Sequence, residues 1–262
     1  MLMIKGESLI GLGRFEEGVA CLEAAHASAP LYLDPLERLV RAYVGRDDGK
    51  RLHWLEVLDN ISPRNLRRKY DVGRLHQRLG NQEEGERRFS EAMTLARTES
   101  PHIFSQVAVD IAEVVVDQSL PLAESFLIEA MNSREGKFGP DDMMLFNRLG
   151  LNLRRQGKWK DAEACYVRAL TISPKDEGLH YNLGMVLAEA GDLHGALARF
   201  DKALALNPNL GSDSKTVSVN MGHVYLQAGL HERAVVFFEQ ALALTPNDNA
   251  ILRALQHARQ AA

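Results

Sequence analysis

The chain has 262 residues, a formal net charge of −4 and a hydrophobic share of 45%. This is the composition of a soluble globular protein, and its near-balanced charge gives no overall field that would recruit nucleic acid or an anionic membrane. No uncharged apolar run approaches the ~18 residues of a membrane span. The N-terminus lacks the basic start, apolar stretch and cleavage site of a signal peptide, so we expect a cytoplasmic protein.

The N-terminal half carries a weak repeat of small residues and predicts four helix pairs. Segments 1–31 and 66–99 share the pattern most fully, through Gly6, Gly13, Gly18, Ala25 and Pro30 in the first and Gly73, Gly80, Gly85, Phe89 and Ala92 in the second. Segments 32–65 and 104–137 are degenerate, with Leu39 and Ile111 where the pattern has glycine. Helix ends in 32–65 are therefore expected to be shifted by a few residues.

The C-terminal half repeats the same pattern clearly, in segments 143–176, 177–210 and 215–248. The first two are 34 residues apart, and the shared positions are Gly150, Gly184 and Gly222, then Gly157, Gly191 and Gly229, Ala162, Ala196 and Ala234, Tyr166, Phe200 and Phe238, Ala169, Ala203 and Ala241, and Pro174, Pro208 and Pro246. In each segment, apolar residues recur at helical spacing both before and after the glycine at the position of Gly157, Gly191 and Gly229.

Each repeat therefore predicts a helix, a turn with glycine past the helix end, and a second helix closed by proline. The small residues are expected where helices cross, since a larger side chain would overpack the crossing. Asp141 and Asp176 are predicted N-caps for the helices that follow them. Residues 249–262 predict one more amphipathic helix that caps the last repeat.

A fixed period of this length is typical of a solenoid of stacked helix pairs. The quoted spacings resemble the tetratricopeptide repeat family over almost the whole chain. The resemblance implies an all-α fold, a single right-handed superhelical solenoid over 1–262. It would contain seven repeats, 1–31, 32–65, 66–99, 104–137, 143–176, 177–210 and 215–248, and a capping helix at 249–262. The opening repeat starts part-way into its first helix, which favours a piece cut from a longer protein.

The same resemblance implies that the first helix of each repeat lines a concave groove that binds a protein or peptide. The positions that would face the groove and contact a peptide include Arg74, Arg78, Asn147, Arg148, Leu151, Arg155, Tyr181, Asn182, Met185, Asn220 and His223. In the fourth repeat, the corresponding positions from Ser105 to Val116 would form an apolar strip.

Two features of this predicted groove can carry binding. Asparagine amides can hold the backbone of an extended peptide because each offers donors and acceptors, although asparagine is common at this position in the family whatever the ligand. Arginine guanidinium groups pair well with carboxylates or phosphates, which favours an acidic partner. The alternative is that these arginines form a solvated helix face.

Three other functions stay open at this point. Segments 61–80 and 145–163 are similar to the output region of some bacterial response regulators, which suggests an adaptor region of a signalling protein. A second alternative is a helper region of a larger enzyme such as a glycosyltransferase. The third is nucleic-acid binding through the basic run 64–69, which the scarcity of stacking aromatics nearby does not favour.

Catalytic and metal-binding patterns are missing from the sequence. The nine histidines form neither an H-E-x-x-H pair nor a cluster with zinc-ligand spacing. The Gly11–Gly13 segment has no strand before it and is interpreted as a helix-pair turn. Cys21 and Cys165 occupy equivalent repeat positions and are interpreted as buried, reduced thiols. We therefore expect no enzyme, no metal and no cofactor, and the sequence carries no signal for an oligomeric state.

Overall fold

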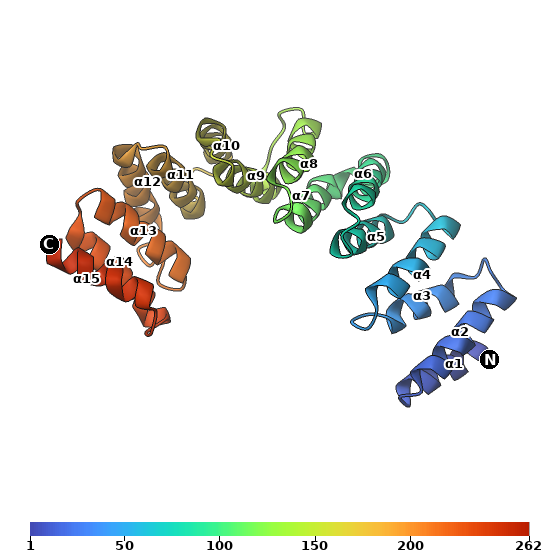
Figure 1. The fold of residues 1–262 in the computed structure, drawn as a ribbon. Helices are drawn as coiled ribbons and strands as arrows, with labels where there is room; N and C mark the ends of the chain where they lie inside the picture. The colour runs from blue at the N-terminus through green and yellow to red at the C-terminus, as the bar shows by residue number, and fades with distance from the viewer. Residues whose placement is uncertain (262) are drawn as a thin grey trace. The chain divides into compact units, whose positions relative to one another are not determined.

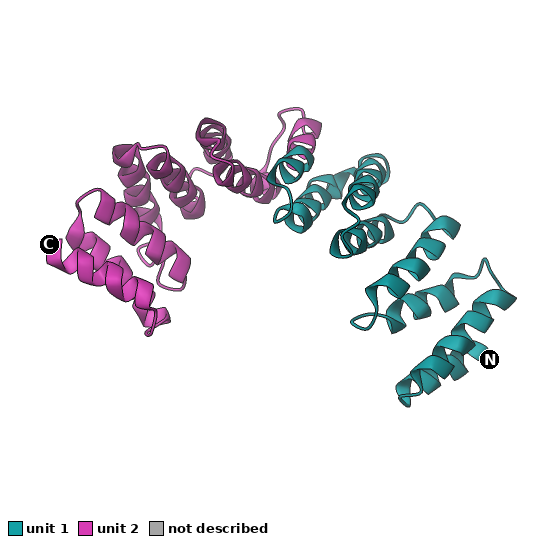
Figure 2. Cartoon of the chain, in the orientation of Figure 1, with its two compact units in different colours: residues 1–126 teal, residues 127–262 magenta. Residues whose placement is uncertain are grey.

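The computed structural model describes residues 1–261 and contains fifteen α-helices and no strand within them (Figure 1). The chain divides into two compact units, Met1–Phe126 and Leu127–Ala262 (Figure 2). The boundary lies inside helix α8 (Leu120–Ser133). One helix pair falls within each of the seven predicted repeats, and α15 follows the last pair.

Unit 1 contains the first three helix pairs and the helix that opens the fourth. Its helices are α1 (Leu2–Gly11), α2 (Phe15–Ser28), α3 (Leu33–Ala42), α4 (Asp48–Ile61), α5 (Leu66–Arg78), α6 (Gln82–Glu99) and α7 (Phe104–Val115), and a 3₁₀ turn, η1 (Pro101–Ile103), precedes α7.

Unit 2 contains the last three helix pairs and the final helix. Its helices are α9 (Met143–Arg155), α10 (Trp159–Ile172), α11 (Glu177–Glu189), α12 (Leu193–Leu206), α13 (Lys215–Gln227), α14 (His231–Leu244) and α15 (Asn249–Ala261), and a 3₁₀ turn, η2 (Pro140–Asp142), precedes α9.

The predicted glycine turns are confirmed by their backbone angles. Gly157, Gly191 and Gly229 follow the first helices of the last three pairs with φ of 71°, 92° and 73°. In this left-handed region a side chain would clash with its own backbone, so glycine ends the helix without strain. Gly45 has φ 71° after α3, so the degenerate second repeat keeps this turn.

The second role of glycine is to let the two helices of a pair cross closely. A Cβ placed on Gly184 would lie 2.5 Å from Phe200 Cε1, and one on Gly222 would lie 2.7 Å from Phe238 Cε1. A Cβ placed on Gly150 would likewise lie too close to the ring of Tyr166. The aromatic ring of the second helix therefore fills the space that the glycine of the first helix leaves open, which is the close crossing that the sequence predicts.

The core of unit 2 continues through its helix pairs as a series of aromatic contacts. The rings of Tyr181 and Phe200 stack with centroids 6.0 Å apart, and Phe200 lies 6.1 Å from Tyr225. Tyr225 in turn stacks on Phe237 at 5.4 Å. Because these contacts join α11, α12, α13 and α14, each pair is stabilised by its neighbours, as in other repeat arrays.

Two sequence predictions about exposure and capping are wrong. The apolar strip of α7 does not face a groove: Ala108, Val109, Ala112 and Val115 are all at most 4% exposed and belong to the core. Asp176 caps α11 by accepting the Leu179 N–H at 2.9 Å, as predicted, but Asp141 does not cap α9.

The residue next to Asp141 has a structural role instead. Asp142 is 1% exposed, and its Oδ2 accepts hydrogen bonds from Gly139 N–H and from Arg134 Nη2, both at 2.9 Å. A buried carboxylate needs such partners because burial without them is costly. Asp142 therefore fixes the segment between α8 and α9.

The cysteines are both free. Cys165 is buried, its Sγ lies 3.4 Å from the carbonyl oxygen of Phe146, and burial raises the pKa of its thiol to about 12. It is therefore a neutral core side chain at physiological pH. Cys21 is half-buried, so the prediction of full burial holds for Cys165 only.

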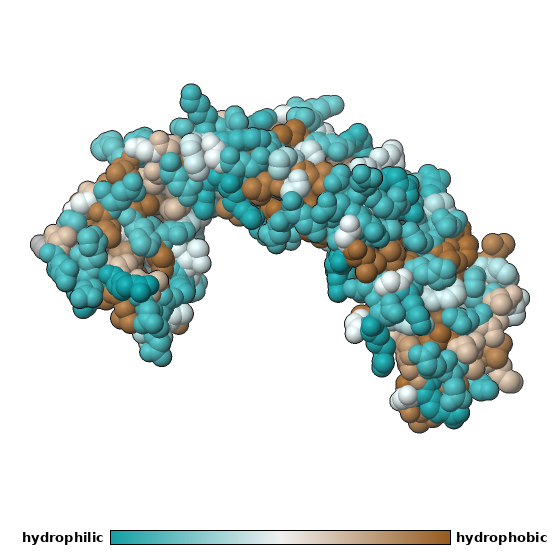
Figure 3. Space-filling view, viewed as in Figure 1, coloured by the Kyte–Doolittle hydropathy of each residue, from teal (hydrophilic) through white to brown (hydrophobic). Residues whose placement is uncertain are grey.

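Hydrophilic side chains cover much of the visible face of each unit, with hydrophobic patches between them (Figure 3). Exposed hydrophobic side chains gather at the N-terminal end of unit 1, where the most exposed are Met1, Ile4, Leu12 and Leu31. Among residues 1–261, no helix combines the length and the apolar character that crossing a membrane requires.

Candidate functional site

The predicted binding residues of unit 2 lie on its three first helices, α9, α11 and α13. The structure joins these helices through their asparagines. Asn182 on α11 donates from Nδ2 to Asn147 Oδ1 on α9 at 2.8 Å. Asn220 on α13 donates from Nδ2 to the hydroxyl of Tyr181 on α11 at 2.9 Å. We call Asn147, Asn182 and Asn220 the asparagine row.

The asparagine row remains accessible to a ligand. Asn147 is exposed, and Asn182 and Asn220 are partly exposed. An amide has two N–H donors and an oxygen with two lone pairs. The two hydrogen bonds described above use one donor of Asn182, one donor of Asn220 and one lone pair of Asn147. They therefore orient the amides and leave hydrogen-bonding capacity on each.

Cationic side chains are concentrated on α9. Arg148 and Arg155 are exposed, and Arg154 pairs with Glu189 of α11 at 3.5 Å. Burial raises the pKa of the Glu189 carboxyl, and the charge of Arg154 opposes this effect. Glu189 therefore offsets part of the charge of Arg154, and Arg148 and Arg155 also have interactions within the chain.

Two predicted contact residues are less accessible than the sequence suggests. Tyr181 is 8% and Met185 7% exposed, and both pack in the unit 2 core. Burial raises the pKa of the Tyr181 hydroxyl, and its hydrogen bond with Asn220 opposes this. Tyr181 therefore affects the asparagine row indirectly, through its hydrogen bond with Asn220.

The remaining candidates of unit 2 border the row. Leu151 on α9 is partly exposed and His223 on α13 is exposed. The His223 ring meets Phe238 edge-on, with centroids 5.1 Å apart. This contact holds the imidazole in place on the α13 surface.

The arginines predicted for unit 1 are engaged by neighbouring carboxylates. Arg74 lies 3.5 Å from Asp71, and Arg78 lies 2.8 Å from Asp48 of α4. Arg67 also pairs with Asp71, at 3.2 Å. Because each of these cations has an acidic partner within unit 1, the α5 face offers an acidic ligand less net charge than its sequence suggests.

The basic run 64–69 is similarly used within the chain. Arg64 pairs with Glu99, and Lys69 lies 2.9 Å from Asp59. Arg68 is 7% exposed and donates to the carbonyl oxygens of Leu58 and Ser62 at 3.1 and 2.8 Å, at the end of α4. The run therefore ties α4, α5 and α6 together instead of forming a free basic surface.

A network of partly buried charges at the junction of α4, α5 and α6 was not predicted. Its centre is Asp59, which is 1% exposed and accepts from Lys69 and Arg88 at 2.9 and 3.1 Å. Arg88 also bonds Glu84 at 3.0 Å, and Lys69 lies 3.1 Å from Glu91. No local motif marks these residues, because their pairing depends on how three helices pack.

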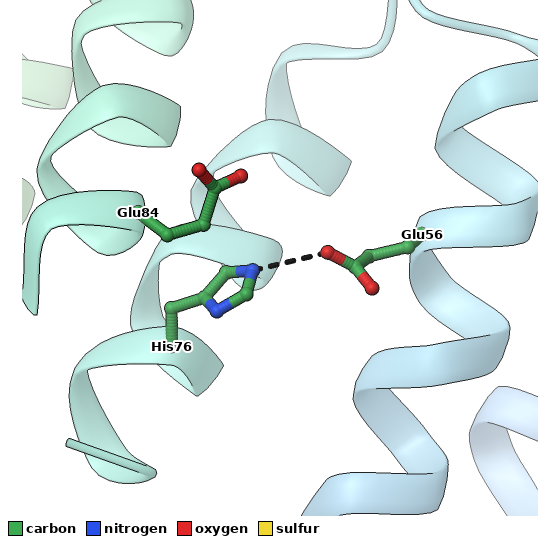
Figure 4. Close-up of side chains that lie close together, drawn as sticks. All are labelled: Glu56, His76 and Glu84. Atoms are coloured by element: carbon green, nitrogen blue, oxygen red, sulfur yellow. Dashed lines mark hydrogen bonds and ion pairs between the residues drawn. The ribbon is translucent and has the colours of Figure 1, made fainter. Parts of the chain in front are cut away.

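The same junction brings together one group with metal-ligand chemistry (Figure 4). His76 Nε2 lies 3.1 Å from Glu56 Oε1, and one ligand atom from each of Glu56, His76 and Glu84 lies within 4.8 Å of the others. Carboxylates and imidazole are suitable zinc ligands. Both oxygens of Glu84, however, already accept hydrogen bonds from Arg87, so a cation would have to displace this guanidinium.

Two family models match the C-terminal half of the chain. The model described as tetratricopeptide repeat matches residues 176–247, and the one described as TPR repeat matches residues 150–191. A search of the curated proteins finds no match.

Several solved structures share the fold at low sequence identity. The C-terminal part of a TPR repeat-containing protein from Cytophaga hutchinsonii superposes with a TM-score of 0.63 at 13% identity, covering 97% of this chain and 99% of that one. A tetratricopeptide repeat protein from Parabacteroides merdae gives 0.51 at 16%, covering 98% and 97%.

A third similar structure is a chain of the APC/C hetero-tetramer Cut9–Hcn1, with a TM-score of 0.53 at 16% identity. The match covers 98% of this chain and 55% of that one, so the present chain spans about half of its length. At such identities these likenesses establish the fold alone. Residues 150–247 therefore match tetratricopeptide repeats, and the all-α architecture of helix pairs supports the same repeat fold for the rest of the described chain.

Proposed function

We propose that the chain is a non-catalytic interaction scaffold and that the α9–α11–α13 face of unit 2 binds an extended segment of a partner protein. The observation that carries this proposal is the asparagine row on three successive first helices, in which Asn182 donates to Asn147 at 2.8 Å and Asn220 donates to the Tyr181 hydroxyl at 2.9 Å. Tetratricopeptide arrays and other solenoids use extended surfaces of this kind to bind partners.

The asparagine row suits the backbone of a peptide. An extended segment presents one donor and one acceptor per residue, and amides can satisfy both kinds of group. Since the amides are already oriented by their bonds to Asn147 Oδ1 and to the Tyr181 hydroxyl, binding would order few side chains. Pre-organised contacts cost less entropy on binding, which supports this face over a flexible surface.

The arginines of α9 support an acidic partner. Arg148 and Arg155 are exposed beside the asparagine row, and hydrogen bonds from guanidinium to carboxylate are about twice as strong as neutral ones. The basic run 64–69 is bonded to carboxylates and carbonyls of unit 1, which argues against nucleic acid as the ligand. No observation in residues 1–261 favours the response-regulator or enzyme-helper alternatives.

Affinity capture from the native cell extract, followed by calorimetry with the captured partner, tests the proposal. The variant Asn182→Ala is expected to weaken binding by about 3–10-fold, because a net hydrogen bond contributes about 0.5–1.5 kcal/mol. The double variant Arg148→Ala, Arg155→Ala is expected to weaken an acidic partner by about tenfold or more.

Matched controls separate these effects from general damage. Asn132→Ala removes an exposed amide from α8, and Arg253→Ala with Lys202→Ala removes two exposed positive charges elsewhere in unit 2. Both controls are expected to bind as the unchanged protein does. Equal affinities for Asn182→Ala and Asn132→Ala would show that the partner does not use the asparagine row.

A further inference from the structure

The junction of α4, α5 and α6 in unit 1 has the ligand chemistry of a metal site. Glu56, His76 and Glu84 come from these three helices, and the ends of their side chains surround a common space (Figure 4). One ligand atom of each lies within 4.8 Å of the others. The ligand atoms of a tetrahedral zinc ion lie roughly 3.3–3.6 Å apart, given metal–ligand distances of about 2.0–2.2 Å. Rotation of the two glutamate side chains, which are each 34% exposed, is therefore enough to close the site.

His76 is held in the orientation that a metal ligand needs. The residue is buried, its Nε2 lies 3.1 Å from Glu56 Oε1, and its Nδ1 lies 3.4 Å from Asn81 Nδ2. Asn81 is the N-cap residue of α6, yet its side chain makes no capping hydrogen bond and contacts His76 instead. A half-turn of this exposed amide presents its oxygen to a proton on Nδ1. An imidazole that donates from one nitrogen in this way can bind a metal through the other.

The ion pairs around this space contain more carboxylates than cations. They join four carboxylates with three cations, namely Glu56, Asp59, Glu84 and Glu91 with Lys69, Arg87 and Arg88. The second carboxylate oxygen of Asp59, Oδ1, is buried and accepts no hydrogen bond within residues 1–261. A buried carboxylate oxygen without a donor is unfavourable. With His76 neutral, the junction is therefore short of one positive charge.

Arg87 is the group that a metal ion has to replace at Glu84. It donates to both oxygens of Glu84 and to Glu91, and its side chain is 53% exposed. Because exposed ion pairs contribute little to stability, this guanidinium can turn toward solvent. A divalent ion in its place would balance the four carboxylates, since Lys69 and Arg88 remain bonded to Asp59.

We propose that Glu56, His76 and Glu84 form a zinc site, with a water molecule as fourth ligand on the side of the open pocket that Asn81 and Arg87 line. One imidazole with two carboxylates suits zinc, whereas magnesium and calcium prefer oxygen ligands alone. The ion replaces Arg87 at Glu84 and links α4 to the α5–α6 pair. The sequence does not reveal this site, because its ligands are spread over three helices. It lies in unit 1 and is independent of the function proposed for unit 2.

Calorimetric titration of the metal-free full chain with zinc chloride tests the site. We expect one zinc ion per chain. His76→Asn and Glu84→Gln are each expected to weaken binding by more than the roughly 10–100-fold that loss of a residue orienting a ligand costs. The matched control His102→Asn removes an exposed histidine of unit 1 and should leave the affinity unchanged. Circular dichroism checks that each variant is folded, and Glu84→Gln alters a partly exposed side chain in case the buried His76 does not tolerate replacement.

A second variant tests the exchange between zinc and the guanidinium. Arg87→Gln is expected to raise the zinc affinity about tenfold, because it removes the competing positive charge. The matched control Arg14→Gln removes another exposed arginine of unit 1 that pairs with a glutamate three residues further on, and it should have no effect. X-ray absorption spectroscopy of the zinc-bound chain should show nitrogen and oxygen ligands at about 2.0–2.2 Å and no sulfur.

Four results would overturn the zinc site. The first is no zinc binding by the unchanged chain, and the second is binding that falls as much in His102→Asn as in His76→Asn. The third is a sulfur ligand, which would place the ion at a cysteine. The fourth is a zinc affinity that Arg87→Gln leaves unchanged or lowers. None of these results would affect the function proposed for unit 2, because the variants lie in unit 1.

Discussion

Single glycines determine how closely the helices of each pair approach. At Gly184 an added methyl group would lie 2.5 Å from Cε1 of Phe200, whose ring is fully buried. A buried aromatic ring in a packed core has little room to move. The same relation holds at Gly73, where an added Cβ would lie 2.7 Å from Phe89, so both units use this contact.

Substitution of one such glycine is expected to destabilise its unit. Gly184→Ala should lower the free energy of unfolding by about 1–3 kcal/mol, the usual cost of overpacking, as measured by urea denaturation followed by circular dichroism. The control Gly11→Ala places a methyl group in open space at the end of α1 and should leave stability unchanged or slightly higher. Equal stability of the two variants would contradict this account of the crossings.

At the residue scale, the sequence predicted which residues lie at the helix crossings better than how exposed each side chain is. The spacing of Gly150 and Tyr166 or of Gly184 and Phe200 predicted the crossings correctly, because a crossing depends on residues of one repeat. The burial of Tyr181 and Met185 depends on neighbouring helices. Periodicity identifies the face of a helix on which a side chain lies, but not how deeply that face is covered.

At the scale of helices, charged side chains hold α4, α5 and α6 together. The carboxylate of Asp59 on α4 accepts from Lys69 Nζ on α5 and from Arg88 Nη1 on α6, at 2.9 and 3.1 Å. Glu84 at the start of α6 extends this network through Arg87 and Arg88. The degenerate repeat at 32–65 lacks the small residues of a close crossing. These ion pairs instead connect its second helix, α4, to the next helix pair, α5 and α6.

The Glu84 carboxylate makes part of this stability dependent on pH. Its hydrogen bonds with Arg87, and secondarily with Arg88, lower its pKa to about 2, below the ~4.3 of an unfolded chain. A lowered pKa in the folded state contributes stability that is fully present above the unfolded pKa and is lost as the pH falls through about 2.

The variant Glu84→Gln is therefore expected to be less stable than the unchanged protein by about 0.2–1 kcal/mol at pH 7, since the pair is partly exposed. The difference should shrink steadily between about pH 4 and pH 2, as measured by thermal unfolding across this range. In an Arg87→Gln background the difference should be smaller at every pH. An equal difference in stability between Glu84→Gln and the unchanged protein at pH 3 and at pH 7 would contradict the assignment of this stability to the ionised Glu84 carboxylate.

The charge network also shows what the sequence could not reveal about helix packing. The helices themselves, their glycine turns and the cap at Asp176 follow from local patterns, and the structure bears them out. The partners of Lys69 and Arg88 lie 10 and 29 residues away on other helices. Their meeting depends on the rotation of each helix about its axis, which a degenerate repeat does not define.

At the scale of the whole molecule, each compact unit is an array in which neighbouring helix pairs stabilise one another. In unit 2 the aromatic contacts from Tyr181 to Phe237 form the core, and the asparagine row lies on the first helices of the same pairs. The core thus fixes the spacing of the three amides. The central claim is that a partner binds over this row.

Hydroxyl-radical footprinting of the full chain, with and without its captured partner, tests this claim most directly. Met144 on α9 and His223 on α13 are exposed beside the row, and His194 on α12 is exposed on a second helix of the same unit. We expect bound partner to suppress oxidation of Met144 and His223 and to leave His194 unchanged. Protection of His194 with continued oxidation of Met144 and His223 would contradict the account.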